Sequence, residues 1–236
     1  MRTTCLLFVF LAAFLTPRTA PAQYYEPSEY EPLQVRFASI GAVKRTFDPL
    51  ASNVLPDSER ISFDRWVPTI GLRTGIVDLS FGYAKFRLQG LSRETVFFGA
   101  AVSQDIVLVG KRTAALIMPL MVAADFTKAE GTGKERTTFN IASTGIGGGL
   151  KYRSITPTLD FSLQVTELFH YSFEGLSTGS GFSAATIGDV LLVFPRALLL
   201  DGIAVGYRMR YQTWSMSEAR FDYKSFYHGP YLAILF

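Results

Sequence analysis

The chain ends in the stretch YLAILF at residues 231–236, an apolar run that stops on an aromatic residue. Successive side chains of a β-strand point to opposite faces. Counted back from Phe236 in steps of two, Ile234 and Leu232 therefore share one face. The stretch predicts a strand with one apolar side and the free carboxylate at its end.

This ending resembles the C-terminal strand of bacterial outer-membrane β-barrels, in which a terminal Phe helps the assembly machinery to recognise the chain. The resemblance covers the last six residues. It implies that Leu232, Ile234 and Phe236 form a C-terminal assembly signal. The partners implied are the barrel-assembly machinery, outer-membrane lipid and lipopolysaccharide.

The beginning of the chain predicts export. Arg2 supplies a positive charge, residues 6–15 form an apolar run, and residues 20–22 (Ala-Pro-Ala) provide a small-residue cleavage site. These three features together are typical of a secretory signal peptide. We expect residues 1–22 to direct the chain through the Sec pathway and to be removed. The apolar run is too short for a membrane-spanning helix.

Two segments follow the signal. Residues 23–32, with three tyrosines and two prolines, predict an extended periplasmic tail. Residues 33–236 predict one folded body. The only cysteine, Cys5, lies inside the signal, so the mature chain has no thiol for a disulfide, a thiolate metal site or a cysteine nucleophile.

Charge and histidine content exclude several functions. Loss of Arg2 and Arg18 with the signal lowers the formal net charge from +3 to +1, and no basic patch remains that would indicate a nucleic-acid partner. The two histidines, His170 and His228, and the scattered carboxylates lack the spacing of metal ligands. We therefore expect no metal and no cofactor.

Ten segments with strand character follow residue 32. They are 33–46, 63–73, 76–89, 95–109, 113–127, 138–153, 157–173, 184–199, 202–217 and 222–236. Most are longer than the five or six residues of an average strand in a soluble protein. They also exceed the roughly 9 to 11 residues with which a tilted strand crosses a bilayer.

The connections between these segments alternate in length. Short ones lie near residues 74–75, 110–112, 154–156 and 200–201, and longer polar ones at 47–62, 128–137 and 174–183. Two others, near 90–94 and 218–221, are only modestly longer than the turns. Short periplasmic turns and longer outer loops are typical of a transmembrane up-and-down barrel.

Alternation of apolar and polar residues is clearest in the later segments. In 202–217 one face carries Ile203, Val205, Tyr207, Met209 and Tyr211, and the other Ala204, Gly206, Arg208, Arg210 and Gln212. Such a pattern suits a strand with lipid on one side and a polar interior on the other. In 157–173 the pattern is interrupted by Glu167, which falls on the apolar face.

Two other classes of protein fit the sequence less well. A helical membrane protein needs a run of about 18 apolar residues, which is missing after the signal. A soluble β-barrel of lipocalin type also alternates. Long strands, the terminal Phe and aromatic residues near many strand ends, typical of interfacial girdles, favour the membrane barrel. We predict an all-β, single transmembrane antiparallel up-and-down β-barrel of about ten strands, with eight or twelve as alternatives. It resembles small barrels of the OmpA and OmpX type in architecture only.

The polar faces would place eleven charged residues in the lumen. These are Arg36, Lys44, Arg73, Asp78, Asp105, Lys151, Arg153, Asp160, Asp189, Arg208 and Arg210. Barrels of about eight strands are filled by side chains, and open channels appear at about sixteen. We therefore expect a largely plugged polar lumen with a paired charge network, in which Arg208 and Arg210 contact Asp105, Asp160 or Asp189.

One short motif suggests catalysis. His170 and Ser172 lie two apart on one strand face and could act as base and nucleophile, with Glu174 orienting the imidazole. The motif resembles the His-any-Ser element of outer-membrane lipid A deacylases. It departs from that family because Phe173 and Glu174 follow where the family has Asn and a small residue. The structural alternative, polar filling of the lumen, is favoured.

Two glycine-containing segments carry structural expectations. Three glycines, at 145, 147 and 149, share one face and predict close packing or curvature. The pair Gly229-Pro230 predicts a bulge that resets the alternation of the last strand and keeps His228 away from lipid.

Three functions follow from this reading. A structural or surface-interaction barrel is favoured, because no motif goes beyond lumen filling. A narrow, porin-like pore for small solutes is the alternative. A rim enzyme that acts on lipid A or lipid through His170 and Ser172 is the second alternative. The surface ligand is not specified by the sequence.

Overall fold

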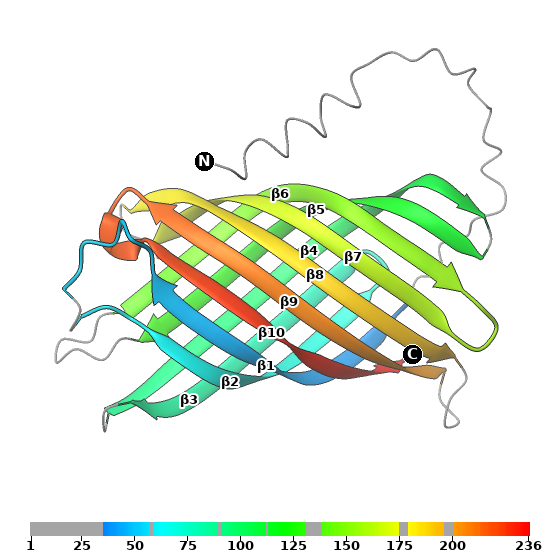
Figure 1. The fold of residues 1–236 in the computed structure, drawn as a ribbon, viewed down its shortest axis with the longest axis horizontal. Coiled ribbons are helices and arrows are strands. Elements are labelled where there is room, and N and C mark those ends of the chain that lie inside the picture. The colour runs from blue at the N-terminus through cyan, green and yellow to red at the C-terminus, as the bar shows by residue number, and fades with distance from the viewer. Residues whose placement is uncertain are drawn as a thin grey trace, which may run out of the picture. The chain divides into compact units, whose positions relative to one another are not determined.

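The computed structural model describes residues 35–56, 59–88, 91–111, 113–130, 138–174, 179–195 and 201–236. The predicted signal peptide, 1–22, and the predicted periplasmic tail, 23–32, lie outside these residues. The described strands form one closed, antiparallel, up-and-down β-barrel (Figure 1). The predicted fold class and strand number are therefore confirmed.

The strands follow one another around the barrel in chain order. They are β1 (Phe37–Pro49), β2 (Phe63–Thr74), β3 (Val77–Leu88), β4 (Leu91–Lys111), β5 (Ala114–Glu130), β6 (Thr138–Ile155), β7 (Asp160–Glu174), β8 (Ser180–Pro195), β9 (Gly202–Met216) and β10 (Tyr223–Leu235). A 3-10 turn, η1 (Ala219–Phe221), precedes β10. We call the end of the barrel with the connection 50–62 the loop end and the end with Phe236 the turn end.

β1 and β10 close the barrel. Their ladder begins at Phe37 opposite Leu235 and extends to Pro49 opposite Tyr223. The expected bulge at Gly229-Pro230 is wrong, because β10 keeps one register with β9 through both residues. A register shift occurs instead in β4, between Val107 and Val109.

The outer face carries a broad band of apolar side chains. On β10 Leu232, Ile234 and Phe236 are 54–60% exposed, and β9 presents Val205, Tyr207, Met209 and Tyr211 in the same way. Exposed aromatic residues include Trp66, Tyr83, Tyr171, Phe182 and Phe226 in the loop-end halves of their strands, and Tyr152, Phe194 and Phe236 at the turn end. Apolar bands bordered by aromatic girdles are what a bilayer requires of a barrel. Among the described residues, no helix has the length and apolar character to cross a membrane.

The face assignment of the first strand was wrong. Lys44, expected in the lumen, is half-exposed on the outer face and pairs with Asp64 at 3.0 Å. Arg36 is exposed just before β1. The odd-numbered residues of β1 point inward instead, with Phe37 and Phe47 buried. Apolar residues lie on both faces of this strand, because its inner face packs against aromatic side chains in the lumen.

His228 and Glu167 are polar residues on the outer face. Tyr207 Oη lies 2.5 Å from His228 Nδ1, and the ring of Phe226 lies beside the imidazole at a centroid distance of 5.2 Å, tilted by 31°. Glu167 Oε1 accepts a hydrogen bond of 2.8 Å from the hydroxyl of Thr186. Each polar group therefore has a neighbour on the same face that reduces the cost of its exposure to lipid.

The three glycines of β6 allow close approach of β7. A Cβ added at 145, 147 or 149 would collide with a backbone carbonyl oxygen of β7. The predicted close packing is therefore present at these positions.

Candidate functional site

The loop end of the lumen contains a buried cluster of side chains, which we call the aromatic cluster. Its members are Phe47, Ile61, Phe63, Ala129, Phe139, Ile141, Trp214, Met216, Phe221 and Tyr223. The rings of Phe139 and Trp214 meet edge to face at 5.2 Å, and Phe47 stacks on Tyr223 at 5.0 Å. Aromatic pairs at such distances add to the stabilisation from apolar burial.

The connection between β1 and β2 is fastened to η1 over this cluster. Leu50 N donates to the carbonyl of Asp222 at 3.0 Å, and Ser52 Oγ to its carboxylate at 2.5 Å. Asn53 Nδ2 donates to the carbonyl of Arg220 at 2.9 Å. Arg60 Nε donates to Leu55 O at 2.7 Å. These bonds hold this part of the loop in one conformation.

Below the aromatic cluster lies a buried arginine, Arg45, that the sequence analysis did not identify. Its Nε donates to Ser225 Oγ at 3.1 Å and its Nη1 to Thr95 Oγ1 at 2.9 Å. The guanidinium carbon lies 5.6 Å from the ring centroid of Phe47 and 5.1 Å from that of Phe97. Hydroxyl groups and aromatic faces therefore surround the charge.

A second buried charge site, the central pair, joins opposite parts of the wall. Arg210 on β9 donates to both oxygens of Asp125 on β5, at 2.9 and 2.5 Å. His170 Nε2 on β7 lies 2.9 Å from Asp125 Oδ2, in an orientation that does not make a hydrogen bond. Asp125 was missed because only the closed barrel brings it opposite Arg210. The sequence feature that could have identified Asp125 is the alternation of β5, in which it shares the inward face with Ala123 and Thr127.

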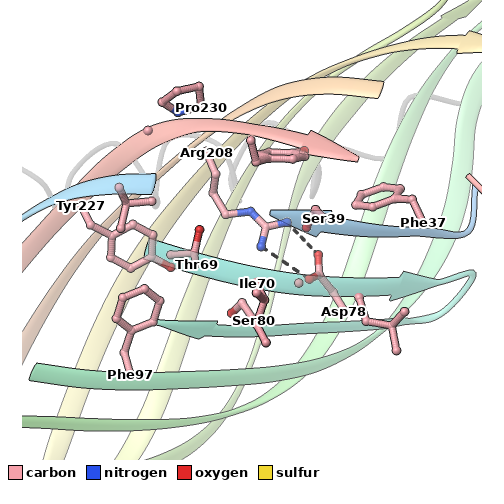
Figure 2. Close-up of a pocket in the computed structure, with 15 residues that line it drawn as sticks. Phe37, Ser39, Thr69, Ile70, Asp78, Ser80, Phe97, Arg208, Tyr227 and Pro230 are labelled. Carbon is pink, nitrogen blue, oxygen red and sulfur yellow. Dashed lines mark hydrogen bonds and ion pairs between the residues drawn. The ribbon is translucent and has the colours of Figure 1, made fainter. Parts of the chain in front are cut away.

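A third group, the lower network, contains two arginines and two carboxylates. Asp78 accepts from Arg73 at 2.5 and 3.0 Å and from Arg208 at 2.9 Å. Asp189 accepts from Arg73 at 2.9 Å and from the hydroxyl of Tyr231 at 2.9 Å. Figure 2 shows Arg208 reaching Asp78. Two positive and two negative groups neutralise one another here, as a low-dielectric interior requires.

Two further pairs lie toward the turn end. Lys151 Nζ lies 2.9 Å from Asp105 Oδ2, and Arg153 Nε donates to Asp160 at 3.0 Å. The expected contacts of Arg208 and Arg210 with Asp105 or Asp160 do not form. Those two carboxylates pair with basic residues of β6 instead. Of the expected contacts, Arg208 with Asp189 occurs, at 3.6 Å.

The suggested catalytic residues are buried and engaged elsewhere. Ser172 Oγ lies 2.7 Å from Ser143 Oγ and donates to Ser183 Oγ at 3.1 Å. The side chain of His170 has no exposed surface and faces Asp125. Glu174 is partly exposed at the end of β7. A base and nucleophile must meet within hydrogen-bond distance, and here the serine hydroxyl is bound by two other serines.

Small cavities lie between these groups. They measure about 20, 40, 50 and 80 Å³. The cavity drawn in Figure 2, about 40 Å³, lies between Phe37, Asp78, Arg208 and Tyr227. A water molecule needs roughly 10 to 15 Å³ of such a volume, so each cavity has room for at least one water. No group of three His, Cys, Asp or Glu side chains within the described ranges could hold a metal ion.

No family model and no curated protein matches the chain. The chain matches several solved structures, among them the following three. The outer membrane protease OmpT from Escherichia coli has 7% identity and a TM-score of 0.34, covering 86% of this chain and 95% of that one. The β domain of the Bordetella autotransporter BrkA has 13% identity and a TM-score of 0.30, covering 86% and 100%. A Pseudomonas aeruginosa FadL homologue has 8% identity and a TM-score of 0.24, covering 85% and 90%. Similarity at this level carries no argument about function.

Proposed function

We propose that this protein is an outer-membrane β-barrel with a structural or surface-interaction role and a lumen that is closed to solutes. The observation that supports a closed lumen most directly is the aromatic cluster, which occupies the loop end of the lumen above the central pair and the lower network. Water and small ions would have to displace packed rings to pass. A surface-interaction role is supported by the part of loop 50–62 that hydrogen bonds hold in place.

The outer face supports the membrane location. Strands of 12 to 21 residues present apolar side chains outward, and a soluble protein rarely exposes so extensive an apolar surface. A terminal Phe that is 57% exposed fits a residue read by assembly machinery. Export through the Sec pathway, as the signal peptide predicts, would bring the chain to the periplasm.

The pore and the enzyme are less well supported. The cavities described above measure about 20 to 80 Å³, volumes that suit bound water better than a diffusing solute. The enzyme hypothesis needs a substrate at Ser172, whose side chain is completely buried. Neither alternative has an observation that favours it over the closed barrel.

Conductance in planar bilayers tests the closed lumen. The wild-type protein is expected to give no step-like currents, even when insertion is verified by the shift in gel mobility that folded barrels show on heating. Discrete, reproducible openings from a preparation with this heat shift would overturn the proposal. Recovery of the mature chain in the periplasmic fraction, without a heat shift, would overturn the membrane location itself.

A further inference from the structure

The hydrogen-bonded wall of the barrel is interrupted between β2 and β3. Their ladder runs from Thr74 opposite Val77 to Thr69 opposite Gly82 and stops there. Residues 63–68 of β2 continue to the loop end paired with β1 alone, and residues 83–88 of β3 paired with β4 alone. Figure 1 shows the two strands separating toward this end. We call residues 63–68 and 83–88 the open edges.

The sequence explains where the ladder stops. Pro68 directly precedes Thr69, the residue of β2 at which pairing with β3 stops toward the loop end, and has no amide hydrogen to donate, which restricts proline to the edges of sheets. On the lumen side the rings of Phe63 and Phe86 lie 5.3 Å apart, tilted against each other. Phe63 belongs to the aromatic cluster, so the interior behind the open edges is packed. The interruption of the ladder therefore does not open a path into the lumen, and it changes only the wall and its outer surface.

Unpaired backbone groups cannot face hydrocarbon. Each one would cost several kcal/mol in the bilayer core. Trp66 and Tyr83 are 59% and 41% exposed and lie on the outer face at the beginning of the open edges. Aromatic residues of this kind mark the interface between hydrocarbon and headgroups. Residues 63–65 and 84–88 extend from these two aromatic residues toward the loop end. In the proposed membrane location they lie at the level of the lipid headgroups.

The open edges also carry three basic side chains. Arg65, Lys85 and Arg87 are all exposed. Arg65 belongs by its position to the inward series of β2, and its guanidinium carbon lies 5.9 Å from the ring centroid of Phe86, yet the residue is exposed at the rim. Two carboxylates on this part of the wall contact other cations, although Glu94 is also the register partner of Lys85. Asp64 pairs with Lys44 at 3.0 Å, and Glu94 contacts Lys128.

We propose that the open edges bind the phosphate-bearing headgroup of a lipid in the outer leaflet. Guanidinium groups bind phosphate through two parallel hydrogen bonds, and ammonium groups add point charge. Free backbone N–H groups along an exposed edge are additional donors to an anion. Trp66 and Tyr83 then contact the apolar part of the same lipid. This inference rests on the proposed location of the barrel in the outer membrane.

Quenching of Trp66 fluorescence measures this binding. The chain contains two tryptophans, and Trp214 is 1% exposed inside the lumen, so lipids brominated close to the headgroup quench Trp66 selectively. The protein is reconstituted in vesicles of phosphatidylcholine with increasing fractions of brominated phosphatidic acid, and in parallel with brominated phosphatidylcholine. The expected preference for phosphatidic acid is at least about fivefold, the contribution of one basic side chain near a membrane surface.

Two variants with equal charge loss decide the site. The triple variant Arg65→Gln, Lys85→Gln, Arg87→Gln is expected to lose the preference. The control triple Arg36→Gln, Lys111→Gln, Lys224→Gln removes the same charge elsewhere and is expected to retain it. Equal quenching of the wild type by both lipids, or retention of the preference in the first triple variant, would overturn the inference and leave the membrane location intact. Complete absence of quenching by brominated phosphatidylcholine would overturn the membrane location and the inference together.

Discussion

Replacement of Asp125 by Asn tests whether the central pair is sealed from water. In the wild type, Asp125 accepts two hydrogen bonds from Arg210, at 2.9 and 2.5 Å, and both side chains are more than nine-tenths buried. The Asn side chain is nearly isosteric but carries no charge. Arg210 remains protonated, so the variant leaves a buried guanidinium without a counterion.

Loss of one partner of a buried ion pair costs about 3 to 5 kcal/mol. With a dependence on urea of about 1 to 3 kcal/mol per molar, the unfolding midpoint falls by about 1 to 5 M. The measurement is urea unfolding of the barrel in lipid vesicles, followed by tryptophan fluorescence and by gel mobility. Asp64→Asn is the matched control, because Asp64 forms a half-exposed pair with Lys44. Such exposed pairs contribute about 0 to 1 kcal/mol.

The double variant Asp125→Leu, Arg210→Met removes both charges together. Apolar replacement of a complete buried pair is often neutral or stabilising, so this variant is expected to recover most of the lost stability. The reasoning is refuted if Asp125→Asn costs no more than Asp64→Asn. That result would mean that bulk water reaches Arg210 and that the lumen is open at this level.

Three other predictions test separate parts of the barrel. Gly147→Ala is expected to reduce the yield of folded barrel, because the added Cβ would collide with a backbone carbonyl of β7. Gly148→Ala is the control and is expected to be tolerated better, because its Cβ would lie 3.1 Å from the nearest atom. Equal yields of the two variants in refolding assays would contradict this. Trp214→Ala is expected to lower the free energy of unfolding by about 3 to 5 kcal/mol, the usual cost of a large-to-small change in a packed core, and an unchanged urea midpoint would argue against the aromatic cluster as a core. Deletion of Phe236, which is 57% exposed, should leave refolding into detergent unchanged but lower the amount inserted in cells; equal amounts of inserted protein would rule out its role as an assembly signal.

The positions of the strands could be derived from the sequence because lipid and a polar interior impose a period of two on each strand. Segment 202–217 became β9, Gly202–Met216, with the predicted faces. Alternation was less informative in β1, where apolar residues occur on both faces. There Lys44 was assigned to the wrong side, because the aromatic filling of the lumen removes the contrast between inside and outside.

Contacts across the lumen depend on features that one strand does not contain. Arg210 was expected to pair with Asp105, Asp160 or Asp189, and it pairs with Asp125 on a strand that is not its neighbour. Alternation identifies which side chains point inward, but the strand number and the offset between neighbouring strands decide which of them meet.

The sequence alone therefore determined an all-β chain with about ten long, alternating strands and an aromatic residue at its end, since these properties are local and repeat along the chain. The closed structure decided which carboxylate neutralises which arginine, that Ser172 is bound by two other serines, and that β2 and β3 separate after Thr69 and Gly82. These properties arise when ten strands close with one particular offset, because closure brings together residues that lie far apart in the sequence.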